Sequence, residues 1–343
     1  FQTLALENFT AFKETSFEWS PGVNVLIGAN GTGKTHIMKL MYALQMQGHD
    51  AAELKKKLAA VFRPSGDKVS RLVNRKKGSN TARISLSNSA AQSLSLTFDT
   101  TRHNTFELQG EWAVERSPVF IPVKEVLSFA PGFISLYDKY ELAFEEVYYD
   151  IIKQAYLPAR KGMPLNDEKP LLELIRKTVG GKVTLEGDEF HLSAGSKKLE
   201  MSLVAEGHRK LALIWQLIHN GSLFANNTLF WDEPEANLNP ALMPEVAKIL
   251  LMLAERGVQV FVATHDYAFL RELDFARQET PTRYFSLELT QEDGVIAHSF
   301  SRYRDIRPNK IADEFQRLYD LEVRHCWGTF RETLGGKAGV VRV

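Results

Sequence analysis

The sequence has one cysteine, no excess of either charge and no long apolar run. The lone Cys326 cannot form an intramolecular disulfide, which suits a reducing compartment. Lys plus Arg and Asp plus Glu both number 42, so no overall basic field indicates nucleic acid or an anionic membrane as partner. No stretch reaches the roughly 20 apolar residues of a bilayer-spanning helix, and no signal-peptide pattern opens the chain. We therefore expect a cytoplasmic protein that has no membrane partner, and any nucleic acid has to bind local basic patches.

The hydrophobic pattern predicts an α/β fold with an interrupted core. An apolar strand over 23–27 is followed by an amphipathic helix over about 34–47. Alternating residues at 83–87 and 93–98 predict half-buried antiparallel strands that form a smaller sheet beside the parallel one. A polar, lysine-rich stretch over about 48–80 predicts an exposed helix and loop. Residues 124–179 have helical periodicity, and a hairpin is expected over 183–192, with its turn at Gly187 and Asp188.

A phosphate-binding pattern lies between the first apolar strand and the helix that follows it. The pattern G-x-x-x-x-G-K-[ST] is matched by Gly28, Ala29, Asn30, Gly31, Thr32, Gly33, Lys34 and Thr35. Glycines let consecutive N–H groups surround phosphate oxygens, and the helix N-terminus adds a positive field. In such a loop Lys34 reaches the β- and γ-phosphates and the Thr35 hydroxyl ligates Mg²⁺. The chain is therefore predicted to bind ATP with Mg²⁺.

Two later apolar strands bring acid and imidazole chemistry to the same sheet edge. Residues 229–231 lead into Asp232 and Glu233, and residues 258–264 lead into His265. Neighbouring side chains of a strand diverge, so Asp232 can serve the metal while Glu233 faces the attacking water. His265 can contact the γ-phosphate. We expect Glu233, His265 and Lys34 to be catalytic, and Thr35 and Asp232 to hold the metal.

With these motifs the chain resembles an ABC-type ATPase of the branch that includes SMC, RecF and OLD-like proteins. In that family a D-loop follows the acidic strand, matched here by 235–240 with Asn237 near the nucleotide. A signature motif opens a helix before that strand, and Val204–Lys210 occupies this place. It departs from the transporter form, because Ala205 replaces a serine and Glu206 a glycine, while Gly207 remains. The family's Q-loop glutamine has no match, since Gln92 opens an alternating strand, so the link between nucleotide and lobe stays unassigned.

The resemblance implies that two copies face each other around ATP, because the signature helix completes the site of the other subunit. The residues that would sandwich one nucleotide are Lys34, Asp232, Glu233 and His265 of one copy and Gly207 of the other. The expected organisation is a first half of the nucleotide-binding core over 1–123, an inserted helical lobe with hairpin over 124–200, a second half over 201–300, and a C-terminal helical extension over 301–343.

Two functions fit this reading. Segments 120–128, 205–210 and 232–238 are similar to ATPases of bacterial anti-phage modules of the OLD, Septu and PARIS type, in which an ATPase controls a nuclease or toxin effector. No carboxylate cluster follows residue 290 and the expected helix over about 310–323 is short, so the effector would be a separate protein.

The alternative is a RecF-like DNA-repair ATPase that clamps duplex DNA through basic runs at 55–57, 71–77 and 197–198. Such short runs are more often solvated surface. A purely structural nucleotide-bound dimer is disfavoured by the intact Glu233.

Overall fold

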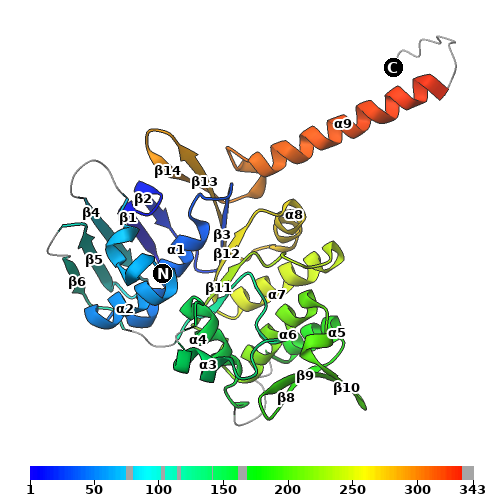
Figure 1. Cartoon of the computed structure of the whole chain (residues 1–343). Helices are drawn as coiled ribbons and strands as arrows, with labels where there is room; N and C mark the ends of the chain where they lie inside the picture. Colours follow the sequence, from blue (N-terminus) through cyan, green and yellow to red (C-terminus); the bar gives the residue numbers. More distant parts are fainter. Residues whose placement is uncertain (75–79, 102–104, 114–116, 141, 161–167, 334–343) are drawn as a thin grey trace.

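The computed structural model describes residues 1–74, 80–101, 105–113, 117–140, 142–160 and 168–333, with side chains up to residue 325 (Figure 1). One mixed sheet of eleven strands in these ranges has the order β6-β5-β4-β1-β2-β14-β13-β3-β12-β11-β7. Its strands are β1 (Thr3–Phe9), β2 (Phe12–Glu18), β3 (Val23–Gly28), β4 (Thr81–Ser87), β5 (Ser93–Asp99), β6 (Phe106–Gly110), β7 (Val119–Ile121), β11 (Thr228–Asp232), β12 (Gln259–Thr264), β13 (Thr282–Thr290) and β14 (Gly294–Phe300).

The parallel half of the sheet consists of β7, β11, β12, β3 and β13. Strands β11 and β12 are buried along their whole length, as their continuous apolar sequences require. In register, Val262 lies opposite both Trp231 of β11 and Val25 of β3. Parallel strands end at one edge, so the phosphate loop after β3, the acidic pair closing β11 and the histidine after β12 meet there.

The antiparallel strands are continuous with the parallel ones. β4 pairs with β1 and β5, and β14 joins β2 to β13, so these strands do not form the separate smaller sheet that the sequence suggested. The half-buried alternation predicted for 83–87 is confirmed, because β4 buries Ile84 and Leu86 and exposes Ser85 between them. Alternation shows which face is buried but leaves the neighbouring strand undetermined.

Helices cover both faces of the sheet. On one face α1 and α2 pack over the antiparallel strands in a core that includes Leu26 and Phe230. On the other face α6, α7 and α8 pack against Val25 and Trp231 in a second core. The helices of the body are α1 (Lys34–Gln47), α2 (Ala51–Phe62), α3 (Phe133–Tyr140), α4 (Glu146–Ala155), α5 (Glu168–Val179), α6 (Glu206–His219), α7 (Met243–Glu255) and α8 (Tyr267–Ala276).

The inserted lobe combines α3, α4 and α5 with a small sheet of β8 (Lys182–Glu186), β9 (Glu189–Ala194) and β10 (Lys197–Glu200). The expected hairpin is present as β8 and β9. Its third strand was not expected, because all four residues of β10 are exposed and show no alternation. The prediction of helix from 124 onwards was too long, since helix begins only at Phe133.

The chain continues into α9 (Lys310–Thr333), which projects away from the body (Figure 1). It is longer than the helix expected over about 310–323, and Phe315 anchors its start by stacking on Tyr267 at 4.4 Å. No helix in the described part of the chain is both long enough and apolar enough to cross a membrane.

Candidate functional site

The phosphate loop turns sharply between β3 and α1. Gly33 precedes α1 with a φ of 84°, in the left-handed region, and a Cβ there would lie 2.7 Å from the Phe12 ring. Only glycine satisfies both conditions without strain. The first N–H groups of α1 therefore face the loop with no side-chain cap competing for them, as an anion site at a helix N-terminus requires.

The lysine and threonine of the loop face its interior and the acidic strand. Lys34 is buried, and its Nζ donates to the carbonyl oxygens of Gly28 at 2.8 Å and Ala29 at 3.2 Å. Burial lowers the pKa of Lys34, while Asp232 and other carboxylates oppose that effect. The Thr35 hydroxyl donates to Asp232 Oδ2 at 2.9 Å.

Thr35 and Asp232 fit a magnesium ion. A hydroxyl and a carboxylate 2.9 Å apart present the oxygen ligands that this hard cation prefers. Burial raises the pKa of Asp232 from 3.8 to about 6, while the hydrogen bond from Thr35 and the charges of Lys39 and Lys34 oppose the rise. A buried carboxylate with only partial compensation is a site for a further cation.

Glu233 and His265 come together at the ends of neighbouring strands. Glu233 Oε1 lies 3.3 Å from His265 Nδ1, and the Glu233 N–H donates to Ala263 O at 2.9 Å. Glu233 has a φ of 49°, which is costly for a side-chain-bearing residue and typical of functional positions. This turn places the Glu233 carboxylate beside His265, and the divergence of the Asp232 and Glu233 side chains stays a prediction.

A third carboxylate supports this pair and was not predicted from the sequence. Glu235 is buried, and its Oε1 accepts from Thr264 Oγ1 at 2.6 Å and from the His265 N–H at 3.2 Å. Burial raises its pKa, and its Oε2 has no hydrogen-bond partner among the residues that the structure describes. Glu235 thereby fixes the backbone on which His265 is carried. The Asp-Glu-Pro-Glu spacing was the only available signal.

The signature segment packs on the D-loop of its own chain. Gly207 is buried, and a Cβ there would lie 2.7 Å from Leu238 Cδ2. Asn237 is exposed and donates to Glu206 Oε1 at 2.8 Å, so it contacts the signature in the same chain. Ala205 gives α6 no side-chain cap, which leaves the first N–H groups of the helix open. The contacts of Gly207 and Asn237 with a nucleotide stay predictions.

Lys210 joins the signature helix to the acidic turn, a contact that was not predicted from the sequence. Its side chain is almost fully buried, and Nζ donates to Ala236 O at 2.8 Å and Glu233 O at 3.4 Å. By donating to both carbonyls, the buried ammonium stabilises the left-handed backbone conformation of Glu233.

A hollow of about 480 Å³ lies beside the phosphate loop. It is lined by Asn30 and His265 on one side and by Asn309, Lys310 and Ile311 on the other. The base of α9 is therefore next to the candidate nucleotide site, although residues 301–343 were expected only as an extension.

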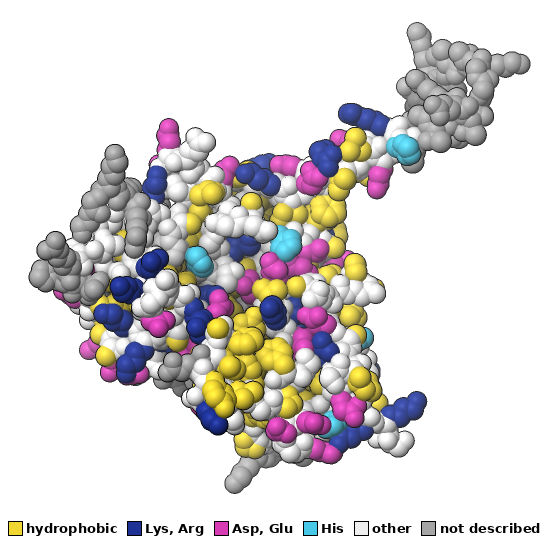
Figure 2. Space-filling model, in the orientation of Figure 1, with side chains coloured by type: hydrophobic (Ala, Val, Ile, Leu, Met, Phe, Trp, Pro, Cys, Tyr) yellow, Lys and Arg dark blue, Asp and Glu magenta, His cyan; other side chains and the backbone are white. Residues whose placement is uncertain are grey.

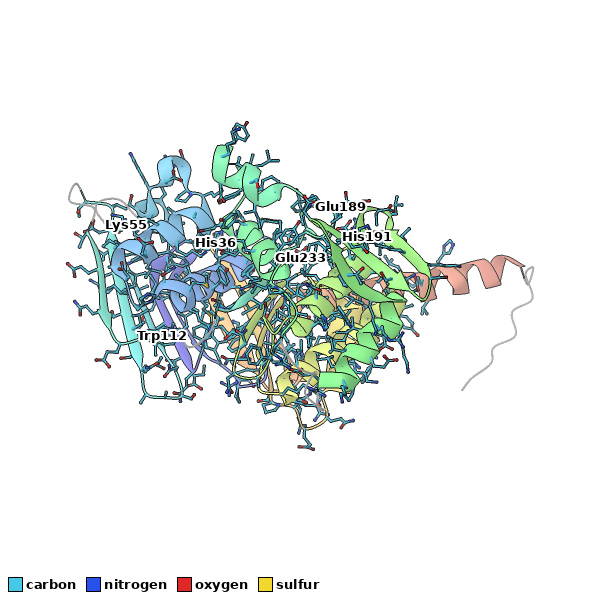
Figure 3. The ribbon with its side chains drawn as sticks, turned by 90° about the horizontal axis from the view of Figure 1, so that it is seen from below. His36, Lys55, Trp112, Glu189, His191 and Glu233 are labelled. Atoms are coloured by element: carbon cyan, nitrogen blue, oxygen red, sulfur yellow. The ribbon has the colours of Figure 1, made fainter. Side chains whose placement is uncertain are left out.

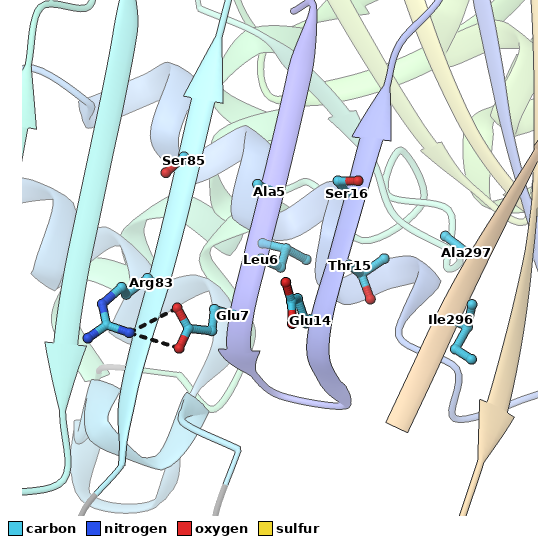
Figure 4. A pocket seen from close by; sticks show the side chains of 10 residues that line it. All are labelled: Ala5, Leu6, Glu7, Glu14, Thr15, Ser16, Arg83, Ser85, Ile296 and Ala297. Carbon is cyan, nitrogen blue, oxygen red and sulfur yellow. Dashed lines mark hydrogen bonds and ion pairs between the residues drawn. The ribbon is translucent and has the colours of Figure 1, made fainter. Parts of the chain in front are cut away.

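Another hollow, of about 490 Å³, lies on the face of the sheet where β2 and β14 diverge (Figure 4). Glu7 and Glu14 line it, and Arg83 is paired with Glu7 at 2.8 Å. Its carboxylates do not suit a phosphate ligand.

The first and third basic runs lie on different parts of the molecule. Lys57 is buried and pairs with Asp150 at 2.5 Å, so the expectation of an exposed run over 55–57 was wrong for this residue. Figure 3 shows Lys55 well separated from His191, on the hairpin sheet that carries Lys197 and Lys198, with Glu233 between them. Figure 2 shows basic and acidic side chains interspersed on the visible face. Residues 75–77 of the second run lie outside the described residues.

The fold is that of SMC head domains. The chain is similar to an Smc head bound to the C-winged helix domain of ScpA, with 15% identity and a TM-score of 0.57 over 89% of this chain and 98% of that one. A second similar structure is the Smc head with an extended coiled coil bound to the C-terminal domain of ScpA, derived from Pyrococcus furiosus, with 14% identity and a TM-score of 0.53 over 94% and 99% of the chains. The α/β fold predicted from the sequence is thus confirmed.

Among curated proteins, the chain is similar to the DNA replication and repair protein RecF of Streptococcus thermophilus, with 30% identity over 87 residues, 25% of this chain and 24% of that protein. RecF of Staphylococcus haemolyticus is 42% identical over 45 residues, 13% of this chain and 12% of that protein. The chain thus spans about a quarter or less of the length of these relatives.

The family model described as "AAA domain, putative AbiEii toxin, Type IV TA system" matches residues 23–271, which include the phosphate loop, the acidic pair and the histidine. The chain belongs to this AAA-domain family.

Proposed function

We propose that this protein binds and hydrolyses Mg-ATP and uses the cycle to switch between a dimer closed around nucleotide and separated subunits. The observation that carries the proposal is the convergence of Thr35, Asp232, Glu233 and His265 at one sheet edge beside the phosphate loop. Bound magnesium would supply charge neutralisation at the phosphates.

Each side chain then has a distinct task. Lys34 binds the β- and γ-phosphates, while Thr35 and Asp232 hold the metal. Glu233 accepts the proton of the attacking water, because its carboxylate lies beside His265 at the sheet edge. His265 contacts the γ-phosphate, and Glu235 keeps it in place.

The proposed dimer depends on the first turn of the signature helix, α6. Lys210 and the D-loop pack the start of α6 onto its own subunit, while the uncapped first turn of α6 stays open to an anion. We infer that this turn, at Gly207, receives the γ-phosphate held by the partner copy. ATP binding would then favour the closed dimer by its differential affinity for that state.

We propose that the switch controls a separate effector, a nuclease or toxin, in anti-phage defence. The family description, which refers to a putative toxin of a Type IV toxin–antitoxin system, supports a role in a system with a second component. The exposed Phe315, Leu318 and Tyr319 of α9 offer an apolar contact surface for such a partner.

A RecF-like DNA-binding role is the second candidate, and the similarity to RecF favours it. The separation of the basic run over 55–57 from the run over 197–198 does not favour it. DNA-stimulated ATP hydrolysis that weakens steeply with salt would support this candidate, because phosphate contacts release counterions.

The test of the ATPase switch is the Glu233→Gln protein, whose mass in solution is measured with and without Mg-ATP. The amide cannot accept the proton, so we expect ATP to be bound but retained and the mass to double. Lys34→Ala serves as the matched control and should stay monomeric. A Glu233→Gln protein that turns over ATP at the wild-type rate would refute the assignment of the base.

A further inference from the structure

We propose that Lys39 and Glu145 link the nucleotide site to the helical lobe, and that α4 carries this link to the signature helix. Lys39 is a positioning residue, not a catalytic one. This inference rests on the proposed function, and it fills the place for which the sequence offers no Q-loop glutamine.

The link begins on one face of α1. Thr35, Lys39 and Tyr42 are spaced i, i+4 and i+7, so they lie on the same side of the helix. Thr35 contacts Asp232, and one turn later Lys39 Nζ lies 2.5 Å from Glu145 Oε1. The Lys39 side chain is only 9% exposed, so solvent screens this pair weakly.

The same helix thus joins the metal carboxylate to the lobe. Thr35 bonds Asp232 and Lys39 bonds Glu145, and the two residues lie about one turn apart on one face of α1. Lys39 is therefore placed to respond to a change of charge at Asp232 while it remains paired with the start of α4.

The Glu145 side chain pairs with Lys39 of α1 and does not cap its own helix, α4. It occupies the N-cap position of α4, yet its side chain makes no capping hydrogen bond there. Because the Glu145 carboxylate binds Lys39 and does not cap the helix, the position of the α4 N-terminus depends on its contact with α1. A change at Lys39 therefore reaches the lobe directly.

The other end of α4 holds the signature helix. Gln216 of α6 donates to Ala155 O at 2.9 Å, and Asn220 donates to Gln154 O at 2.8 Å. Both donors are buried. α4 therefore spans from the phosphate-loop helix to the helix that would meet the partner's nucleotide.

The charges suggest how the link responds. Thr35 and Asp232 would hold the divalent cation, and its positive charge would weaken the attraction of Lys39 to Asp232. The Lys39–Glu145 pair, already in contact at 2.5 Å, would then hold α4 more firmly against α1, and α4 in turn contacts α6. Metal-nucleotide binding in one site would thereby be transmitted to the signature helix that completes the other site.

A second ion pair between the core and α4 provides a matched control. Lys57 of α2 is buried and contacts Asp150 at 2.5 Å and Glu146 at 3.4 Å. It joins the same helix to the core with the same chemistry, but from α2 and to Asp150, which also accepts from the Tyr42 hydroxyl at 2.7 Å. Loss of this pair should lower stability without altering the response to nucleotide.

The experiment compares Lys39→Met, Glu145→Gln, their double variant and Lys57→Met, each made in the full chain with Glu233→Gln. Mg-ATP affinity is measured at low protein concentration, and ATP-dependent association by sedimentation. We expect Lys39→Met and Glu145→Gln to keep nucleotide affinity within about threefold, to weaken association about tenfold, and to be non-additive when combined. Lys57→Met should unfold at lower temperature and associate normally.

The inference would be overturned if the Lys39 and Glu145 variants associated as strongly as the Glu233→Gln protein alone. It would also be overturned if Lys57→Met weakened ATP-dependent association as much as they do. If Lys39→Met does not fold, Glu145→Gln decides, because Glu145 is 36% exposed and keeps its shape as glutamine. Failure of the Glu233→Gln parent itself to bind ATP or associate would instead refute the proposed function.

Discussion

Asp232→Asn should stabilise the nucleotide-free protein, and by more at pH 8 than at pH 5. The pKa of Asp232 rises from 3.8 to about 6 in the folded chain, chiefly because the carboxyl is buried. A group whose folded pKa is raised favours folding when protonated and opposes it when ionised. Its cost is therefore small below pH 4, grows between pH 4 and 6, and is complete above pH 6.

The size of the effect follows from the shift. Two pKa units correspond to about 3 kcal/mol at pH 8, and linkage gives about half of that at pH 5. Asparagine removes the charge but keeps an oxygen that can accept the Thr35 hydroxyl, so the hydrogen bond at 2.9 Å survives. We expect a measured gain of about 2 kcal/mol at pH 8, since the asparagine still loses part of its hydration on burial.

The assay is urea unfolding of both proteins at pH 5, 6 and 8 without nucleotide. Asp99→Asn is a control of opposite sign, because hydrogen bonds from Thr101 and Thr105 lower the pKa of Asp99. Its ionised form stabilises the fold above its ordinary pKa, so this variant should lose stability at pH 8. A gap between wild type and Asp232→Asn that does not change with pH, or a less stable Asp232→Asn protein, would refute the reasoning.

Three further variants examine the site. Lys34→Ala should abolish ATP binding in equilibrium titration, because no other described cation donates within the phosphate loop; binding within tenfold of wild type would contradict this. Lys210→Met should lower kcat at least tenfold with little change in the affinity for ATP, because the carbonyls of Glu233 and Ala236 lose their donor. Glu235→Gln should reduce kcat less, about threefold to tenfold, since an amide oxygen still accepts from Thr264, and an unchanged kcat would show that the switch histidine needs no support.

Much of the candidate site could be predicted because its parts are local. The phosphate loop is one continuous segment, and Asp232, Glu233 and His265 follow apolar strands that parallel topology brings to a common edge. Lys210 could not be predicted, because its partners are backbone carbonyls more than 20 residues away. Pairing across such a distance leaves no pattern in a single sequence.

The missed burial of Lys57 has a different cause. Leu54, Lys57, Leu58 and Val61 follow the i, i+3, i+4, i+7 spacing of a buried helix face. The lysine was interpreted by composition, as part of a basic run, rather than by its position in this stripe. Helical spacing around a charge is thus evidence of burial, provided that a partner such as Asp150 exists elsewhere in the fold.

The site concentrates features that cost folding energy. Asp232 and Glu235 are buried carboxylates, and Glu233 adopts a left-handed backbone conformation. Lys34, Lys39 and Lys210 are buried cations that offset part of this cost, and Lys210 and Lys39 also join the site to another element, α6 or α4. Because a metal ion bound with the nucleotide would place positive charge beside Asp232, the same imbalance that weakens the empty fold supplies free energy that can move those elements when Mg-ATP binds.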